Sequence, residues 1–157
     1  MTISLESAAF AAGKPIPVDY TGDGKDRSPP LSWSDPPART RSLALVMDDP
    51  DAPTEQPWVH WVLYSLPGDL RVLPEGLPTS ATLKNPPGAE QGRNSWNTTG
   101  YRGPAPPRGS GVHHYHFTLY ALDAALDLEL NLDKASLLEA IDGHVLARGE
   151  LVGTYQR

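Results

Sequence analysis

Three segments of the chain carry the hydrophobic pattern of β-strands. Residues Ser42 to Asp49 form a continuous apolar run that ends in two acids, which indicates a strand buried on both faces. Residues Trp58 to Leu66 are rich in aromatic and β-branched side chains, the composition that strands favour. Residues Val112 to Leu122 continue the same kind of pattern later in the chain. These three segments are expected to form the centre of a β-sheet.

Side chains alternate between the two faces of a strand, so the pattern also predicts which polar groups share a face. In the second segment, this rule places His60 on one face and its neighbour Trp61 on the other. The full prediction for the first face is Trp58, His60, Val62 and Tyr64. In the third segment, the same rule groups His113, Tyr115 and Phe117 on one side and His114, His116 and Thr118 on the other.

The two ends of the chain predict weaker elements. Residues Ile3 to Glu6 alternate, which is a weak signal for a strand, and Leu151 to Tyr155 are expected to form a final strand or an extended segment. Between Leu132 and Arg148, apolar residues recur at helical spacing, with Asp133 as the predicted N-cap and Gly143 as the end. A second short helical turn is expected after Gly143.

Composition narrows the class of protein. A length of 157 residues suits a single domain, here taken as residues 1–157, and 17 prolines with 14 glycines predict many ordered loops. The residues between Gly68 and Gly111 are mostly such loop, and a loop of that length usually forms the wall of a site. The absence of cysteine excludes disulfides and thiolate metal sites.

Charge and hydropathy exclude several partners. A net charge of −6 leaves no basic surface for nucleic acid or for an anionic membrane. No apolar run reaches the roughly 18 residues of a membrane-spanning helix, and the first residues lack the features of a signal peptide. A cytoplasmic location is therefore expected.

The candidate chemistry consists of one acid, two histidines and one tyrosine in or beside these strands. Our central hypothesis is that Asp49, His60, His113 and Tyr115 converge on one small pocket. Taken singly, Asp49 also fits an ordinary turn residue before proline, and His60 fits a core histidine. Together, imidazole, phenol and loop N–H groups suit a phosphate or carboxylate, with the acid orienting a histidine.

Two other kinds of chemistry fit the sequence less well. A metal site is not expected, because His113 points away from His114 and His116 and that pair has no evident third ligand. A Ser-His-Asp hydrolase is disfavoured, because no Gly-x-Ser-x-Gly motif is present and Gly109-Ser110-Gly111 is too short a match. No cofactor is expected.

Several motifs in the same order resemble the phosphatidylethanolamine-binding protein family, and its bacterial branch of Raf-kinase-inhibitor-like proteins in particular. They span nearly the whole chain and read Ser28-Pro29-Pro30-Leu31-Ser32-Trp33, Asp48-Asp49-Pro50-Asp51-Ala52-Pro53, Trp58-Val59-His60-Trp61-Val62-Leu63-Tyr64, Gly100-Tyr101-Arg102-Gly103-Pro104-Ala105-Pro106-Pro107, His113-His114-Tyr115, and the tail from Asp142 to Tyr155.

The resemblance implies a fold and a site. The fold would be an antiparallel β-sandwich with a few peripheral helices toward the C-terminus. The pocket would hold the four residues named above and would be lined by Pro53, Trp58, Gly103 and Pro107. Cis peptide bonds would precede Pro53 and Pro57, at Ala52-Pro53 and Gln56-Pro57.

The resemblance also implies functions. Family members bind small anions and phospholipid headgroups such as phosphorylethanolamine, and some inhibit kinases or serine proteases, so a protein partner is an expectation too. Bacterial members are often dimers, which keeps a homodimer among the expectations. One departure concerns His114, which stands where the family commonly has arginine. This difference puts the ion pairing on the outer face of the strand in question.

Three functional hypotheses follow. The favoured one is a non-enzymatic binder of small anions or phospholipid headgroups, with a regulatory effect on a kinase or protease partner. The second is an enzyme that uses the same pocket for acid–base chemistry on a small anionic substrate. The third is an inhibitor that binds proteins through its outer loops and retains only a vestigial pocket.

Overall fold

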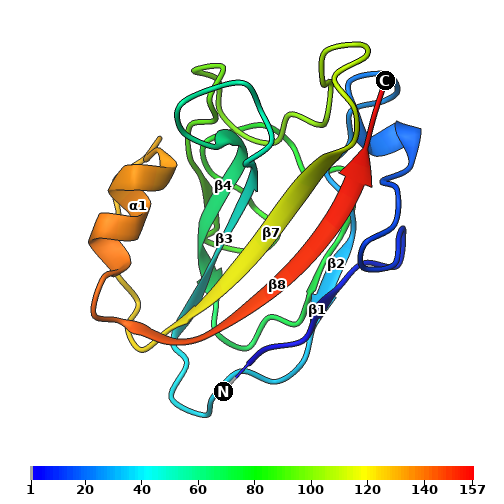
Figure 1. The fold of residues 1–157 in the computed structure, drawn as a ribbon. Coiled ribbons are helices and arrows are strands. Elements are labelled where there is room, and N and C mark those ends of the chain that lie inside the picture. Colours follow the sequence, from blue (N-terminus) through cyan, green and yellow to red (C-terminus); the bar gives the residue numbers. More distant parts are fainter. Residues whose placement is uncertain (1) are drawn as a thin grey trace.

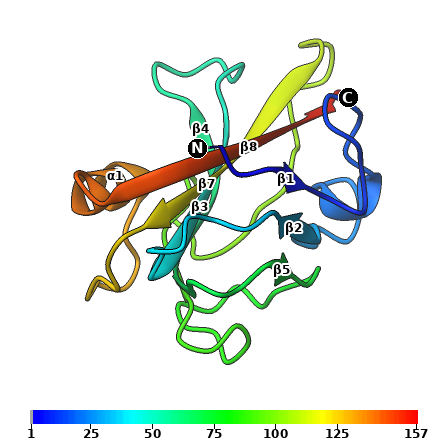
Figure 2. The same ribbon diagram turned by 90° about the horizontal axis from the view of Figure 1, so that it is seen from below.

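Two antiparallel β-sheets form the body of the molecule, which we describe from a computed structural model covering residues 2–157. The larger sheet has the strand order β6 (Glu90–Gln91), β4 (Trp58–Pro67), β3 (Ser42–Asp49), β7 (His113–Leu122) and β8 (Val145–Tyr155). The smaller sheet has the order β1 (Leu5–Glu6), β2 (Leu31–Trp33) and β5 (Val72–Leu73). Figure 2 shows the smaller sheet as a separate layer beside the larger one. The expected mostly β, antiparallel sandwich is therefore confirmed.

Strand β3 lies at the centre of the larger sheet and separates two apolar clusters. Leu45 and Met47 are fully buried in the cluster between the two sheets, whereas Ala44 and Val46 face the other side. Because β3 pairs with β4 on one edge and β7 on the other, every side chain from it enters a covered layer. The prediction of a strand buried on both faces is confirmed.

Helix α1 (Lys134–Ile141) covers the second cluster, and Figure 1 shows it on the outer side of the larger sheet. The Asp133 carboxylate accepts a hydrogen bond of 2.8 Å from the backbone N–H of Ser136, as expected of an N-cap. The Lys134 ammonium is ion-paired at 2.5 Å with Asp48, the next-to-last residue of β3. The helix is thus tied at its first turn to the strand end that carries Asp49.

Besides α1, the described residues contain one short helix. The residues from 18 to 20 form a 3-10 helix, η1 (Val18–Tyr20), near the N-terminus rather than the C-terminus. The second helical turn expected after Gly143 is wrong, because β8 begins at Val145 and pairs with β7 along its whole length. Within residues 2–157, no helix has the length and apolar character needed to cross a membrane.

The start of β8 was not predicted from the sequence, because glycines interrupt its hydrophobic pattern. Gly149 and Gly153 alternate with exposed positions and face the core, but glycine contributes nothing to a hydrophobic pattern. A side chain at Gly149 would place its Cβ 2.5 Å from the carbonyl oxygen of Ile3, so the N-terminal segment requires glycine there. The residue types that allow this close packing therefore conceal the strand in the sequence.

A β-bulge in β4 changes the predicted alternation of its side chains. Met47 of β3 pairs with Trp61, but the next residue, Asp48, pairs with Val59, so His60 is an extra residue in β4. His60 consequently points to the same side as Trp61, against the inter-sheet cluster, and Val59 packs with Val62 and Tyr64 under α1. The predicted grouping of His60 with Val62 and Tyr64 is wrong for this reason.

The predicted cis peptide bonds are also wrong. Among residues 2–157 the one cis bond is Asn85-Pro86, so both Ala52-Pro53 and Gln56-Pro57 are trans. Trans is the lower-energy isomer of an X-Pro bond, and the turn after β3 closes with it. In that turn the N–H of Thr54 donates to the carbonyl of Ala52 at 2.8 Å.

Replacement of the helix cap tests the description of α1. Asp133→Ala should lower the free energy of unfolding by about 1 kcal/mol, because the N–H of Ser136 loses its partner. Asp133→Asn keeps an acceptor oxygen and should retain most of the stability. Urea denaturation of both variants beside the wild type measures the difference, and equal midpoints for Asp133→Ala and wild type would contradict the cap.

Candidate functional site

A small cavity opens where three loops meet at one end of the larger sheet. The connection from β3 to β4 and the segment that leads into β7 run side by side there, at the end where β7 begins (Figure 1). The cavity has a volume of about 210 Å³. Its lining residues are Asp49, Ala52, Pro53, Thr54, Trp58, His60, Trp96, Ala105, Pro106, Pro107, His113 and Tyr115. All four residues of the central hypothesis are among them.

Gly103 is the one predicted site residue that does not line the cavity. It lies behind the wall, where its N–H donates to the Asp26 carboxylate at 2.7 Å. A Cβ at this position would lie 2.3 Å from the carbonyl oxygen of Tyr20. Gly103 is therefore needed for close packing between two loops. A family motif contains residues with this role as well as residues that contact a ligand, so the resemblance did not separate the two.

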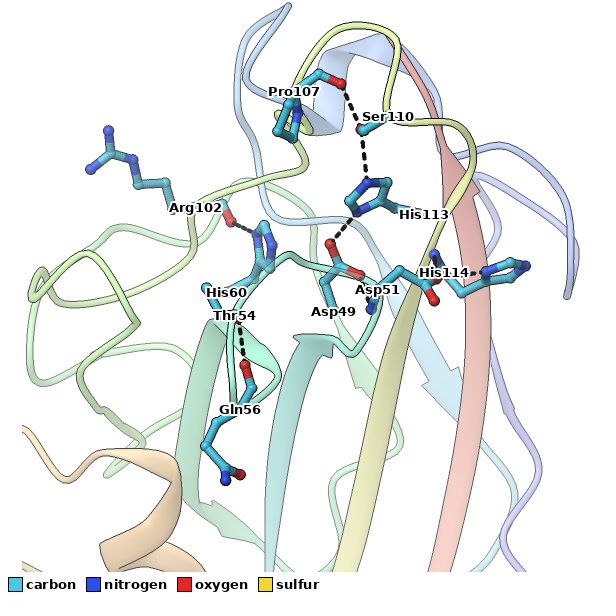
Figure 3. A network of polar contacts seen from close by, with 10 residues as sticks. All are labelled: Asp49, Asp51, Thr54, Gln56, His60, Arg102, Pro107, Ser110, His113 and His114. Carbon is cyan, nitrogen blue, oxygen red and sulfur yellow. Dashed lines mark hydrogen bonds and ion pairs between the residues drawn. The ribbon is translucent and has the colours of Figure 1, made fainter.

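Asp49 and His113 form a buried pair at the bottom of the cavity. The Asp49 carboxylate and the Nδ1 of His113 are 2.6 Å apart, and each residue is only 3% exposed. The second carboxylate oxygen of Asp49 accepts from the N–H of Asp51 at 2.8 Å, which orients it (Figure 3). Both oxygens of Asp49 are thus already used within the protein.

The other nitrogen of His113 has a partner as well. Its Nε2 lies 3.0 Å from the hydroxyl of Ser110, and that hydroxyl donates to the carbonyl of Pro107 at 2.6 Å. A carbonyl oxygen can only accept, and the hydroxyl has a single hydrogen, so Nε2 must donate to Ser110. Both nitrogens of His113 are therefore used within the protein, Nδ1 by Asp49 and Nε2 by Ser110.

Ser110, His113 and Asp49 are connected in the order of a Ser-His-Asp triad, but the hydrogen bond between serine and histidine has the opposite direction. In a triad the histidine accepts the serine proton, whereas here the Ser110 proton points to Pro107 and His113 is a donor. The arrangement orders the loop before β7 instead of activating a nucleophile.

His60 presents one nitrogen to the cavity. Its Nδ1 is 2.6 Å from the carbonyl oxygen of Arg102, and its edge contacts the rings of Tyr115 and Trp96. Burial lowers the pKa of His60, although the Arg102 carbonyl and the Asp49 carboxylate act in the opposite direction. The Nε2 has no hydrogen-bond partner among residues 2–157.

Tyr115 presents the second unused polar atom. Its side chain is 1% exposed, and its hydroxyl has no hydrogen-bond partner in the part of the chain that the structure describes. Burial raises the pKa of Tyr115, and the nearby carboxylates of Asp49 and Asp51 raise it further. The phenol therefore remains protonated at neutral pH and can donate to a ligand.

Aromatic and proline side chains make up most of the remaining wall. Trp58 and Trp96 meet edge to face with ring centroids 5.4 Å apart, and the guanidinium of Arg102 lies 4.8 Å from the Trp96 ring centroid. Trp96 comes from the long loop that was itself predicted to form a wall. Strand alternation could not identify this residue, because it lies outside any strand.

Five lining residues were not predicted from the sequence. Ser110, whose hydroxyl contacts His113, was not predicted either. The lining residues are Ala52, Thr54, Trp96, Ala105 and Pro106. Ala52, Ala105 and Pro106 lie inside the proline-rich motifs that carried the family resemblance, so those motifs were a signal for them.

His114 points away from the cavity, as the alternation predicts. Its ring and its backbone N–H both contact the Asp51 carboxylate, at 2.8 Å and 2.7 Å. These bonds, drawn in Figure 3, hold the turn after β3 against the start of β7. The hydrogen bonds of Asp51 with His114 lower the pKa of that carboxyl against the opposing effect of its partial burial. The residue that replaces the family arginine thus still pairs with an acid.

Known proteins are similar to this chain over nearly its whole length. A family model described as phosphatidylethanolamine-binding protein matches residues 6–156. A UPF0098 protein of Methanothermobacter thermautotrophicus is 49% identical over 155 residues, which are 99% of each chain.

Two solved structures share the fold over nearly the full chain. A putative phosphatidylethanolamine-binding protein homologue from Chlamydia trachomatis has 42% identity and a TM-score of 0.88, with 99% of this chain and 98% of that one covered. YbcL from E. coli, described as a new member of the mammalian family, has 30% identity and a TM-score of 0.91, with coverage of 100% and 99%. The chain therefore belongs to the phosphatidylethanolamine-binding protein family.

Proposed function

We propose that the protein binds a small anionic group, such as a phosphate or a phosphorylated headgroup, in the cavity beside His113. The observation that supports this most directly is that two polar atoms of lining side chains, Tyr115 Oη and His60 Nε2, make no hydrogen bond within residues 2–157. Since both side chains line the same cavity, both atoms are available to a ligand that enters it.

The charges in the cavity support an anion of low charge. At the pocket floor, the Asp49 carboxylate is paired with His113 and with the N–H of Asp51, so both of its oxygens are engaged within the protein. Tyr115 adds a neutral donor. Since the walls are apolar, the interaction between a negative charge and these donors is stronger than it would be in water.

The size of the cavity limits the ligand. A volume of about 210 Å³ lies below the 300–1,000 Å³ typical of pockets for drug-sized molecules. A headgroup fits this volume, but acyl chains would remain outside the protein. The name of the matching family, phosphatidylethanolamine-binding protein, agrees with a ligand of this class.

The same geometry argues for binding rather than acid–base catalysis. Asp49 and His113 are already paired with each other, and the Ser110 hydroxyl donates to the Pro107 carbonyl. The Tyr115 phenol, with its raised pKa, stays protonated, and burial lowers the pKa of His60 and makes that ring a weaker base. We therefore propose a non-catalytic binding protein.

Calorimetric titration tests the proposed function. Wild-type protein should bind phosphate or phosphorylethanolamine, and Tyr115→Phe should weaken binding by about 10- to 150-fold. That range corresponds to the loss of about 1.5–3 kcal/mol for one hydrogen bond to a charged group. His116→Ala serves as the control, because His116 lies on the outer face and pairs with Glu150 at 3.3 Å. Absence of binding heat for both ligands with wild-type protein would overturn the proposal.

The lowered pKa of His60 predicts how stability changes with pH. The unfolded chain takes up a proton at His60 near pH 6.5, whereas the folded protein resists it. Below that pH the unfolded state binds more protons, so the His60 contribution to stability falls as the pH decreases. Its slope has an upper limit of about 1.4 kcal/mol per pH unit.

The matched measurement compares wild type with His60→Ala. Urea denaturation at pH 7.5 and pH 5.5, without phosphate, should show a smaller loss of stability on acidification in the variant. An equal loss in both proteins would show that His60 is not held neutral by burial.

A further inference from the structure

A second cavity lies at the opposite end of the larger sheet from the candidate site. It opens where β3 begins and where β4 and β7 end, beside the segment that connects β7 to α1 and is gold in Figure 1. Its volume is about 200 Å³. The two cavities share no lining residue, so the second one is a separate feature of the fold.

Aliphatic and proline side chains form most of the wall of this second cavity. They are Leu66, Pro67, Pro87, Leu122, Leu126 and Leu128. Apolar cavities of about 150 Å³ in proteins stay free of water and can bind a molecule of the size of benzene. The second cavity therefore has room for an apolar group of about six carbon atoms.

The outer wall is a short strap of chain, residues 125–128, that is fastened only at its ends. Before it, the carbonyl of Ala124 accepts a hydrogen bond of 2.6 Å from the hydroxyl of Ser42. After it, the carbonyl of Glu129 accepts one of 2.6 Å from the hydroxyl of Tyr64. Residues 125–128 themselves make no hydrogen bond to any of residues 2–157.

Side-chain packing alone therefore holds the strap against the sheet. Leu126 and Leu128 are half-buried and pack on the cluster under α1, whereas Asp127 between them is exposed. An outward movement of the strap would break no hydrogen bond within the described residues. The strap can thus admit a ligand at low cost, and its two leucines would then pack on that ligand.

Arg41 is the one charged residue that lines the second cavity. It is exposed, and its guanidinium has no acidic partner among residues 2–157. Since the other walls are apolar, Arg41 lies at the boundary between the cavity and water. A guanidinium binds a carboxylate through two parallel hydrogen bonds, a geometry that suits this group to organic acids.

The other polar side chains of the cavity have no hydrogen to offer a ligand. Ser65 donates its single hydroxyl hydrogen to Glu90 at 2.8 Å, and Ser42 donates its own to the carbonyl of Ala124. Glu90 does not line the cavity. Arg41 is therefore the one lining side chain that can donate to a ligand.

We propose that the second cavity is a ligand site for a monocarboxylic acid with a small apolar body, for which hexanoate is a suitable probe. In the complex, the hydrocarbon lies between Leu122 and the two leucines of the strap, and the carboxylate pairs with Arg41. A ligand of this kind satisfies both features of the cavity, its apolar wall and its single cation. This inference does not depend on the anion proposed for the first cavity.

NMR titration of the full chain with hexanoate locates the site. A ligand of about eight non-hydrogen atoms binds weakly, and NMR measures weak binding directly. Hexanoate should shift the methyl resonances of Leu122, Leu126 and Leu128. The ring resonances of Tyr115 report entry into the first cavity, and with excess phosphate present they should not respond to hexanoate.

A pair of arginine variants tests the role of charge. Arg41→Ala should weaken hexanoate binding by about two- to fivefold, the range expected for one exposed ion pair. Binding of 1-hexanol, which has no charge, should not change. Arg39→Ala is the matched control, because Arg39 is exposed and lies two residues away but does not line the cavity. It should leave both ligands unaffected.

Salt gives a second measurement of the same interaction. An increase to about 1 M NaCl screens exposed charges, so it should weaken hexanoate binding to the wild type. The effect should be absent in Arg41→Ala. Leu126→Phe adds volume on the strap and should weaken hexanoate and hexanol equally. If that variant does not fold, the arginine pair and the salt dependence still decide the question.

Three results would overturn the proposal. Methyl resonances of Leu122, Leu126 and Leu128 that stay unchanged with hexanoate would show that the cavity is a packing void. Shifts confined to Tyr115 would show that hexanoate enters the first cavity instead. Equal hexanoate affinities for Arg41→Ala and Arg39→Ala, with no effect of salt on the wild type, would show an apolar cavity without preference for acids.

Discussion

The buried bond between Asp49 and His113 connects the parts of the structure on which the pocket depends. It joins the last residue of β3 to the first residue of β7 at 2.6 Å, and both side chains are almost entirely buried. Removing one partner of such a pair would leave a buried charge without compensation, a change that typically costs about 3–5 kcal/mol. The turn after β3 and the loop before β7 are thereby held on opposite sides of one cavity.

This pairing also decides which atoms a ligand can reach. Since Asp49 and His113 satisfy each other, and Ser110 satisfies the outer nitrogen of His113, these groups define the electrostatic background of the site. The atoms left for a ligand are the hydroxyl of Tyr115 and one nitrogen of His60.

The distribution of charge in the pocket resolves a conflict in the sequence. A chain with a net charge of −6 does not attract anions through its overall field, so an anion must be bound by local donors. The proposed anion site would meet this requirement with the phenol of Tyr115 instead of free basic side chains. The arginine nearest to the aromatic wall, Arg102, contributes its carbonyl to His60 and stacks its guanidinium on Trp96.

The amino-acid sequence by itself determined the central strands and three of the four pocket groups by direct reasoning, and the family motifs in it determined the class of fold. Continuous apolar runs required buried strands at 42–49 and near 58–66, and alternation correctly turned His113 and Tyr115 to one side. The helix capped by Asp133 was also predictable from the sequence, because its signals lie within one turn of the chain. The family motifs added the lining residues Pro53, Trp58 and Pro107.

Only the tertiary structure decided how His60 reaches the pocket. Alternation alone would place it under α1, and the extra residue in β4 reverses its direction. Pairing between two strands creates that bulge, and a loop more than forty residues away selects the ring tautomer. Neither effect is encoded in local residue spacing, because both depend on backbone groups that meet only after the chain has folded.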